Sequence, residues 1–520
     1  MPEEPGGLLV TAPDTLPAWR LIEARAEATP GRLLAVDARG RRMTFAAYRD
    51  ACLRVAAAFH ARGVGRDDRV AWMLPTRLEA FVLAGALARL GAVQIPLIPI
   101  LREREVGFVL GQTRADVLVC PGVWRGHDHP AMAARSIASV AEPVELIVAD
   151  PELPEGDPED LPPYEPPGDD PIRWIFYTSG TTANPKGALH TDRTVAACAH
   201  RMNLRFDAQP DDRNGLVFPV THIGGIAFLL GGLMVGYTQL LVEVFDPEAS
   251  CAFLGREGVT LAGAGPVFWM TYVDQQRKHP DRRLFPALRA LLGGGAPKSP
   301  TIHDEVRDVL GVVLATGYGM TECPSAAHSS VHDPDDVLRS DGHALDDAEI
   351  RIVARDGRVC GPGDEGEIRV RGPMLFAGYV DAGDDAEAFD ELGFHRSGDL
   401  GHLDARGVLT VTGRVKDIII RKGENISAKE IEDVLHLHPA VADAAVVALP
   451  DRERGELACA VIVVARGMRA PTLTDLTGHC LACGLSARKL PERLELLDEL
   501  PRNPTGKVLK HELQARYTDE

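Results

Sequence analysis

The sequence predicts an α/β protein with a large N-terminal unit of parallel-type sheets covered by helices, a small β unit at its end, and a smaller α+β unit at the C-terminus. Length is the first observation that predicts it, because 520 residues exceed one ordinary hydrophobic core. The second is the alternation of strand-like and helix-like stretches, which is typical of βαβ units in a largely parallel sheet. We therefore expect a body of sheets and helices followed by a compact smaller domain.

The first part of the chain supplies the βαβ pattern. Its expected elements are a strand at 33–38, a helix that Thr44 caps and Gly63 ends, a strand at 69–74, a helix at 78–90 and a strand at 93–97. From residue 150 to 171 the sequence becomes acidic and rich in proline. Such a composition predicts an exposed connector without regular structure.

A second alternating region, from Trp174 to about Tyr318, contains an uncharged stretch at 223–242 that is long enough to span a bilayer. The glycines of this stretch, with Thr238 and Gln239, instead favour a buried helix followed by a strand at 239–244. Further along, the predicted strands of the small β unit are 348–353, 367–370 and 408–411.

The C-terminal unit begins at the stretch Gly413-Arg-Val-Lys-Asp417. Ser427 can cap a helix at 429–437, and the stretches 441–449 and 457–464 are predicted strands. We therefore expect two domains, residues 1–415 and 416–520, with the second a compact α+β lid.

Composition and charge exclude some classes of protein. A content of 45% hydrophobic and 25% charged residues is that of a soluble globular protein. The formal net charge of −19 argues against a nucleic-acid partner, because the phosphates would be repelled over most of the surface. The first residues have no basic segment followed by an apolar one, so we expect a cytoplasmic protein without a secretory signal or a membrane span.

The nine cysteines are scattered and odd in number, which indicates a reducing compartment rather than a disulfide framework. Cys480 and Cys483 are spaced like a redox or zinc pair, and His479 precedes them. Because a zinc site needs about four ligands and no second pair is near, we expect two small buried residues of a helix instead.

The most informative stretch is 177–187, which follows the apolar run 174–177 and contains hydroxyls, glycines and one lysine but no acidic residue. Its hydrogen-bond donors, which suit a polyphosphate, are Thr178, Ser179, Gly180, Thr181, Thr182, Lys186 and Gly187. The Walker pattern fails here, because Lys186 follows Pro185 and precedes a glycine. An ordinary Ser/Thr/Gly surface loop is the alternative for this stretch alone.

Further segments follow in a fixed order. They are Pro219-Val-Thr-His222, Gly317-Tyr-Gly-Met-Thr-Glu322, Gly366-Glu367 through Gly378-Tyr379, Arg396-Ser-Gly-Asp399, Gly413-Arg-Val-Lys-Asp417 through Gly423 and Glu430-Ile-Glu432, and Pro501-Arg-Asn-Pro-Thr-Gly-Lys507. With these the chain resembles, over nearly its whole length, the adenylate-forming (AMP-binding) superfamily of acyl-CoA synthetases, adenylation domains and beetle luciferases.

The resemblance implies an ATP site that holds Mg²⁺. Glu322 would hold the metal, Thr321 would touch the α-phosphate, and Thr178 would belong to the catalytic phosphate loop. Tyr318, between Gly317 and Gly319, would stack on adenine. The flat opposite wall would consist of Gly294, Gly295 and Ala296. The alternatives are a surface carboxylate at residue 322 and an ordinary glycine turn at 293–295.

Asp399 would accept hydrogen bonds from both ribose hydroxyls, and Arg414 would add a ribose or phosphate contact; a turn aspartate is the alternative. Lys507 would bridge the substrate carboxylate and the α-phosphate. Gly423, after Lys422, would bring backbone against the pantetheine arm of coenzyme A, an approach that only a residue without Cβ permits.

His222 would sit at the mouth of the acyl pocket as a steric and orienting group rather than a general base, with a satisfied core histidine as the alternative. Its neighbours are apolar and include no aspartate to hold an α-ammonium, which favours an acid without an α-amino group. Medium-chain, branched, alicyclic and aryl acids all remain open.

The chain departs from the family pattern at three positions. Ala183 replaces a glycine of the phosphate loop, which adds strain if that position needs a positive φ. His395 replaces a common aromatic residue before Arg396. Lys416 stands at the hinge, where many members of the family carry aspartate.

By this resemblance the chain is an ATP-dependent acid–thiol ligase that makes an acyl-CoA through an acyl-adenylate, with ATP, Mg²⁺, coenzyme A and a small carboxylic acid as its ligands. Two alternatives remain: a free-standing adenylating enzyme that loads a carrier protein, and a catalytically silent nucleotide-binding module. Ala183 motivates the second alternative, but the retention of Lys507, Glu322 and Asp399 argues against it. The oligomeric state stays open, with a homodimer among the alternatives.

Overall fold

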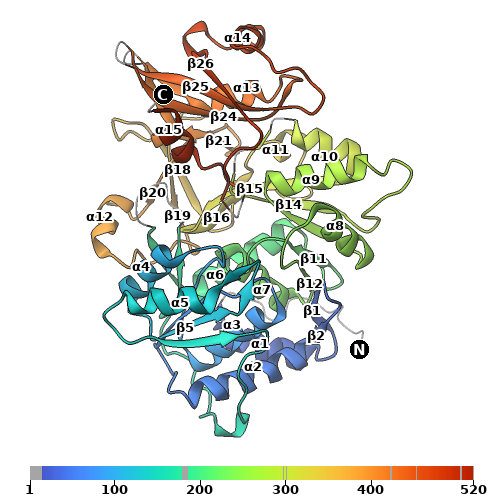
Figure 1. Cartoon of the computed structure of the whole chain (residues 1–520), viewed down its shortest axis with the longest axis vertical. Helices are drawn as coiled ribbons and strands as arrows, with labels where there is room; N and C mark the ends of the chain where they lie inside the picture. The colour runs from blue at the N-terminus through green and yellow to red at the C-terminus, as the bar shows by residue number, and fades with distance from the viewer. Residues whose placement is uncertain are drawn as a thin grey trace.

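The computed structural model describes residues 15–178, 185–296, 298–299, 301–421, 424–451, 454–503 and 506–518. Two large sheets with helices between and outside them form the body, and a smaller unit of C-terminal residues lies at one end of it (Figure 1). This arrangement confirms the predicted α/β class with a large N-terminal and a smaller C-terminal part.

The first large sheet has six strands in the order β10-β9-β4-β3-β5-β8. Its members are β3 (Arg69–Trp72), β4 (Val93–Pro96), β5 (Val117–Pro121), β8 (Glu145–Ala149), β9 (Ile172–Tyr177) and β10 (Gly187–Thr191). All pairings are parallel except that of β10 with β9. The hydroxyl-rich stretch therefore connects two antiparallel strands at the edge of this sheet.

The second large sheet has nine strands in the order β17-β16-β15-β14-β13-β11-β12-β1-β2. Its members are β1 (Leu33–Asp37), β2 (Arg42–Thr44), β11 (Arg213–Leu216), β12 (Thr238–Leu241), β13 (Leu261–Ala264), β14 (Ala290–Gly294), β15 (Val313–Met320), β16 (Cys323–His328) and β17 (His343–Ala344). The six central strands, β15, β14, β13, β11, β12 and β1, pair in parallel. Strand β2 at one edge and strands β16 and β17 at the other pair antiparallel.

Helices form layers between and outside the two sheets. The inner helices are α1 (Ala18–Ala28), α2 (Phe45–His60), α3 (Leu78–Leu90), α6 (Asp192–Arg205) and α7 (Ile223–Val235). Outside the six-stranded sheet lie α4 (Glu103–Thr113) and α5 (His129–Ala138), and outside the nine-stranded sheet lie α8 (Pro247–Arg256), α9 (Pro266–Arg277) and α10 (Ile302–Leu310). Val70 and Trp72 of β3 pack inward and Ala71 outward, so both faces of this strand are buried, which explains its continuous apolar sequence.

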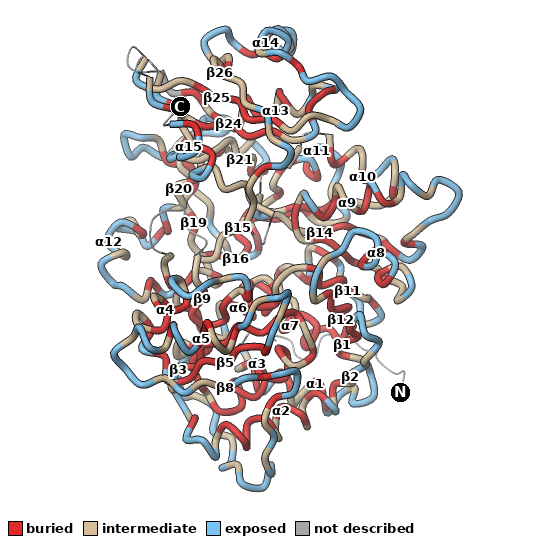
Figure 2. Tube along the Cα trace, in the orientation of Figure 1, coloured by how far each residue is buried: buried red, intermediate tan, exposed pale blue. Residues whose placement is uncertain are grey.

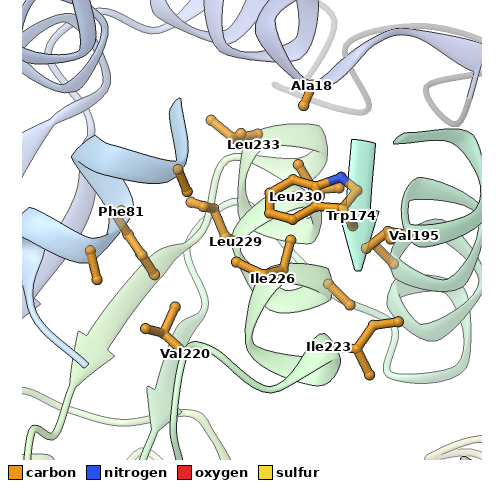
Figure 3. Packing of buried hydrophobic residues seen from close by; sticks show 14 of the residues in the cluster. Ala18, Phe81, Trp174, Val195, Val220, Ile223, Ile226, Leu229, Leu230 and Leu233 are labelled. Atoms are coloured by element: carbon orange, nitrogen blue, oxygen red, sulfur yellow. The ribbon is translucent and has the colours of Figure 1, made fainter. Parts of the chain in front are cut away.

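Helix α7 is the predicted buried helix of the uncharged stretch. Its Leu229, Leu230 and Leu233 pack in the inner cluster with Phe81 and Trp174 (Figure 3). It ends at Gly236, which has a φ of 97°, and β12 follows. Among the described residues no helix is both long and apolar enough to cross a membrane.

The small β unit is an antiparallel sheet in the order β18-β19-β20-β21. Its strands are β18 (Glu349–Val353), β19 (Gly366–Arg371), β20 (His395–Leu403) and β21 (Leu409–Arg414). The C-terminal unit contains β22 (Ile418–Arg421), β23 (Glu424–Ser427), β24 (Val441–Asp451), β25 (Gly455–Val464), β26 (Arg493–Leu497), α13 (Ala428–Leu435), α14 (Leu473–Ala482) and α15 (Lys510–Thr518). The exposed 3₁₀ turn η4 (Val415–Asp417) joins the two sheets.

Shorter elements lie in the connections. They are β6 (Val123–Trp124), β7 (His127–Asp128), α11 (Asp335–Leu338), α12 (Asp385–Ala388), η2 (Pro158–Asp160), η3 (Ala382–Asp384) and η5 (Ala487–Lys489). The buried residues follow the sheets and the inner helices, and the exposed ones lie mainly in the connections (Figure 2).

The predicted strands and helices are present, and their ends shift by a few residues at most. The caps are confirmed, since Thr44 accepts a hydrogen bond from Ala47 N and Ser427 accepts one from Glu430 N. The connector at 150–171 is mostly exposed, but the expectation that it has no regular structure is wrong at η2. The cysteine pair is also corrected: Cys480 is buried, whereas Cys483 follows the last turn of α14 and is exposed.

Candidate active site

Two glycine-rich strand ends lie side by side in the nine-stranded sheet. Gly294 of β14 pairs with Gly317 of β15, and a Cβ on Gly294 would lie 2.2 Å from Gly317 O. A Cβ on Gly319 would lie 2.3 Å from Pro324 O, so both positions exclude a side chain. Gly295 has a φ of 80°, and Ala296 follows it. The structure therefore brings the residues 294–296 next to Gly317 and Gly319.

The Asp399 carboxylate joins β15, β20 and β21. Tyr318 Oη donates to Asp399 Oδ2 at 2.8 Å, and Arg414 Nε donates to Asp399 Oδ1. Asp399 and Arg414 face each other in the register of β20 and β21, which fixes their separation. Burial opposes the charge of Arg414, but Asp399 outweighs it and raises the pKa of the guanidinium. Burial and the same carboxylate raise the pKa of Tyr318.

Lys507 reaches this group from the C-terminal unit. Its backbone N–H donates to Asn503 Oδ1 at 2.9 Å, which fixes the turn that carries it. Burial and the nearby Arg414 lower the pKa of Lys507 to about 8, against the opposite effects of Asp399 and Asp417. The Lys507 ammonium therefore lies close enough to Asp399 and Arg414 for their charges to change its pKa, although the sequence places these residues far apart.

The same loop contacts the body through Gly506. A Cβ on Gly506 would lie 3.2 Å from Val267 Cγ2 at the start of α9. The turn of the C-terminal unit that carries Lys507 therefore lies near the start of α9 and near the end of β21.

A second cluster surrounds Glu322, immediately after β15. Tyr379 Oη donates to Glu322 Oε1 at 2.7 Å. Lys186 Nζ lies 2.8 Å from Asp384 Oδ1 and 5.0 Å from the centroid of the Tyr379 ring. This cluster links the end of the hydroxyl-rich stretch to Glu322 through Tyr379.

The two ends of the hydroxyl-rich stretch are joined by hydrogen bonds. Thr178 N donates to Lys186 O at 2.9 Å, and Lys186 N donates to Thr178 Oγ1 at 3.3 Å. The expected phosphate-loop residues between them, Ser179, Gly180, Thr181 and Thr182, lie outside the described residues, and so do Ala183, Lys422 and Gly423.

The backbone around Glu322 is held from two sides. His190 Nε2 donates to Thr321 O at 2.9 Å, and Phe376 N donates to Glu322 O at 2.8 Å. Sequence reasoning missed His190, Asp384 and the role of Tyr379. Tyr379 lies in the Gly378-Tyr379 segment, which was a usable signal, whereas only the fold brings His190 and Asp384 to this place.

His222 is the N-cap of α7. Its Nδ1 accepts a hydrogen bond from Gly224 N at 3.1 Å, so the imidazole proton is on Nε2. Burial lowers the pKa of His222 to about 4, which makes the ring neutral near pH 7. Within the part of the chain that the structure describes, no hydrogen bond or ion pair joins His222 to the other candidate residues.

His395 fills the position where an aromatic residue was expected. It is 4% exposed and packs edge-on against Phe376, with ring centroids 5.2 Å apart, and near Phe389. Burial lowers the pKa of His395, so the neutral ring acts as part of an aromatic cluster behind Glu322.

Comparison with known proteins agrees with this geometry. The AMP-binding enzyme family model matches residues 22–380, and the model of the AMP-binding enzyme C-terminal domain matches residues 430–507. Among curated proteins, a medium-chain fatty-acid–CoA ligase of Escherichia coli is 31% identical, with 95% of this chain and 90% of that protein covered. A salicyl-AMP ligase / salicyl-S-ArCP synthetase of Mycobacterium tuberculosis is 34% identical, with 92% and 87% covered.

A solved structure is similar over the whole length. The o-succinylbenzoate coenzyme A synthetase of Bacillus subtilis, in complex with ATP and a magnesium ion, superposes with a TM-score of 0.83 at 29% identity and covers 97% of this chain and 100% of that one. The family models, the relatives and this superposition together show that the chain belongs to the AMP-binding, adenylate-forming enzyme family and is an AMP-forming ligase of the acyl-CoA synthetase type.

Proposed function

We propose that this protein is an ATP-dependent carboxylic acid–CoA ligase that activates an apolar acid as its acyl-adenylate and then transfers the acyl group to the thiol of coenzyme A. The observation that carries the proposal is the position of Lys507. A cationic side chain of the C-terminal unit lies within electrostatic reach of Asp399 and Arg414, which are bonded to each other in the body. A nucleotide and a reacting carboxylate would meet there.

The nucleotide would bind along the ends of β14 and β15. Tyr318 would stack on adenine, with Gly294, Gly295 and Ala296 as the opposite wall. Asp399 would accept the ribose hydroxyls, and Arg414 would hold Asp399 in place and contact the sugar or phosphate. Gly317 and Gly319 let β15 pack closely against β16, where a Cβ at either position would clash, and so would hold Tyr318 in place.

The phosphates would bind at the cluster around Glu322. Thr178 and Lys186 lie at the two ends of the hydroxyl-rich stretch, and Thr321 precedes Glu322. Carboxylate and hydroxyl oxygens are ligands that Mg²⁺ prefers, so Glu322 with Thr321 and the triphosphate fits this metal. Bound there, Mg²⁺ would neutralise phosphate charge.

In the first step a carboxylate oxygen of the acid forms a bond to the α-phosphorus of ATP, and the bond from this phosphorus to the leaving pyrophosphate oxygen breaks. Lys507 would hold the carboxylate and the α-phosphate together and stabilise the negative charge that develops on the phosphoryl oxygens. Because burial and Arg414 lower the pKa of Lys507 to about 8, the ammonium form still dominates near pH 7.

In the second step the thiol loses its proton to the solvent, its sulfur bonds to the acyl carbon, and the carbon–oxygen bond to AMP breaks so that AMP leaves. Lys422 and Gly423 would line the approach of the pantetheine arm. We further propose that the two domains meet between residues 415 and 416, where the exposed turn η4 joins β21 to β22. The C-terminal domain would present Lys507 in the first step and Gly423 in the second.

His222 would orient the acid at the mouth of an apolar pocket. Its neutral ring and its Nδ1, which is occupied by Gly224 N, favour orientation over proton abstraction. The neighbouring side chains, including Phe218 and Ile223, are apolar, which supports a medium-chain, branched, alicyclic or aryl acid.

A second candidate is an adenylating enzyme that loads a carrier protein. The observation that favours it is the 34% identity to a salicyl-AMP ligase / salicyl-S-ArCP synthetase. Both candidates share the first step and differ only in the thiol.

A panel of carboxylic acids tests the proposal through pyrophosphate release, with coenzyme A, with a phosphopantetheinylated carrier protein, or with neither. We expect ATP- and Mg²⁺-dependent release with an apolar acid, and an acyl-CoA product by mass spectrometry. Thioester formed only on the carrier protein would favour the second candidate. A silent module would release no pyrophosphate with any acid.

A further inference from the structure

His190 is a fully buried histidine that no part of the proposed reaction uses directly. It lies on β10, the strand that leaves the hydroxyl-rich stretch, and its exposed fraction is 0%. Its Nε2 lies 2.9 Å from Thr321 O, and its Nδ1 lies 3.0 Å from Thr194 Oγ1 on α6. A carbonyl oxygen only accepts hydrogen bonds, so Nε2 carries the proton and Nδ1 is free to accept from the threonine hydroxyl.

The ring is held rigidly by its neighbours. Phe176 contacts it edge-on with ring centroids 6.0 Å apart, and the centroid of the tilted Phe376 ring lies 6.5 Å away. Burial lowers the pKa of His190 to about 4, so the neutral form with one donor and one acceptor persists at physiological pH. The imidazole therefore has one orientation, and this orientation directs a donor at the peptide between Thr321 and Glu322.

Glu322, which follows this carbonyl, is tied to β10 by a second route. Leu189 N donates to Gly378 O, Ala377 N donates to Leu189 O and Val380 N donates to Gly187 O, so residues 376–380 run alongside β10. From this segment Phe376 N bonds to Glu322 O, and Tyr379 Oη bonds to Glu322 Oε1. Strand β10 thus holds Thr321 directly through His190 and Glu322 indirectly through the segment 376–380.

We propose that His190 is a positioning residue for the metal and phosphate part of the active site. By donating to Thr321 O it fixes the peptide that carries the Thr321 hydroxyl and the Glu322 carboxylate, and it couples their position to the strand that leaves the phosphate loop. The assignment rests on the proposed function, because it concerns the residues that would hold Mg²⁺ and ATP. Groups that orient metal ligands typically change metal affinity or activity by about 10- to 100-fold when they are removed.

Two amide variants separate the hydrogen bond from the packing. In His190→Gln the side-chain amide can reach the place of Nε2 and donate to Thr321 O, whereas in His190→Asn the amide is one methylene too short. Both replace a buried ring by a smaller polar group, so both are expected to lose stability to a similar degree. His129→Asn is a matched control in α5, because His129 is also 0% exposed and its Nε2 lies 2.9 Å from the backbone oxygen of Pro99.

The first measurement is independent of turnover: the rise in Tm with ATP and MgCl₂, minus the rise with ATP and EDTA, for the full-length protein. We expect wild type, His129→Asn and His190→Gln to retain this metal-dependent increment and His190→Asn to lose most of it. The second measurement is the Mg²⁺ concentration for half-maximal pyrophosphate release, which we expect to rise about tenfold in His190→Asn and less than about threefold in His190→Gln.

Equal increments and equal Mg²⁺ requirements in the two His190 variants would overturn the assignment, since the donor would then be irrelevant. The same holds if His129→Asn loses the increment as fully as His190→Asn, because general destabilisation would explain both. A wild-type protein with neither a metal-dependent increment nor pyrophosphate release with any acid would overturn the proposed function itself, which separates the two failures.

Discussion

Tyr318 Oη donates a hydrogen bond to Asp399 Oδ2 at 2.8 Å, while Arg414 Nε occupies the other oxygen of the same carboxylate. Without nucleotide, both oxygens of the proposed ribose acceptor therefore have protein partners. A carboxylate oxygen accepts more than one hydrogen bond, but a ribose hydroxyl that approaches Oδ2 competes with the tyrosine for the best geometry. If Asp399 accepts the ribose as proposed, we expect the tyrosine hydroxyl to stabilise the nucleotide-free state more than the nucleotide-bound state.

Tyr318→Phe should separate stability from nucleotide affinity. Loss of a hydrogen bond to a buried charged group should lower the free energy of unfolding without nucleotide by about 1.5 to 3 kcal/mol. The KM for ATP should change by less than about threefold, because the phenylalanine ring retains the stacking surface and a ribose hydroxyl can take the vacated place. Denaturant unfolding and initial rates of pyrophosphate release measure the two effects.

Asp399→Ala is the reference for this prediction. It removes the acceptor itself, and its KM for ATP should rise by about tenfold or more, since hydrogen bonds to charged groups contribute about 1.5 to 3 kcal/mol. An equal rise in Tyr318→Phe would mean that the hydroxyl contacts the nucleotide, which contradicts the competition described here.

Lys507→Ala should divide the two half-reactions. Loss of one fixed cation from a charge-developing transition state typically lowers the rate by about 10²- to 10³-fold, and we expect at least this loss in acyl-adenylate formation. Conversion of a supplied acyl-adenylate to the thioester should stay largely intact, because the lysine charge is needed only during phosphoryl transfer. Single-turnover assays of each half-reaction measure this, and equal losses in both would contradict the role of Lys507.

The pH dependence of adenylation should report the same lysine. Burial and Arg414 lower the pKa of Lys507 to about 8, so the free enzyme loses the required charge as the pH rises through this value. The kcat/KM for ATP should be constant below about pH 7 and fall above about pH 8, because this parameter reports the free enzyme. In Lys507→Arg the fall should disappear, even if the maximum is lower, since arginine stays protonated. An unchanged fall in that variant would assign it to another group.

The sequence allowed the prediction of most elements, because their signals are local. The caps Thr44 and Ser427, the buried stretch that became α7 and the alternation of β and α segments all depend on neighbouring residues. The candidate site residues were found as motifs, and only the family resemblance, not their local pattern, grouped them in one site. The hydrogen bond of His190 to Thr321 O joins residues far apart in the chain, and no local pattern encodes it.

The turn between the two parts of the chain shows where rotation can occur. Arg414 belongs to the body, because it is the β21 partner of Asp399. Asp417 belongs to the C-terminal unit, because Lys510 Nζ of α15 lies 3.6 Å from its Oδ2 and 2.7 Å from Glu432 Oε1. Between these anchors only Val415 and Lys416 remain, and both are exposed. A reorientation of the C-terminal unit that keeps both anchors must therefore turn at these two residues.

Lys416→Pro should restrict this rotation. Proline fixes φ near −65° and also disfavours the helical region for Val415, so it removes freedom at both residues of the hinge. Lys507 already lies within electrostatic reach of Asp399 and Arg414, so adenylation should be retained within about threefold if proline fits the present turn. Thioester formation, for which Gly423 would have to reach the same carbonyl, should fall by about tenfold or more. Lys416→Ala is the matched control, since it removes the same side chain and leaves φ free.

Single-turnover rates of the two half-reactions measure the effect. Survival of both in the proline variant would refute a pivot at Lys416, and an equal loss in the alanine variant would assign the effect to the lysine side chain instead of the backbone.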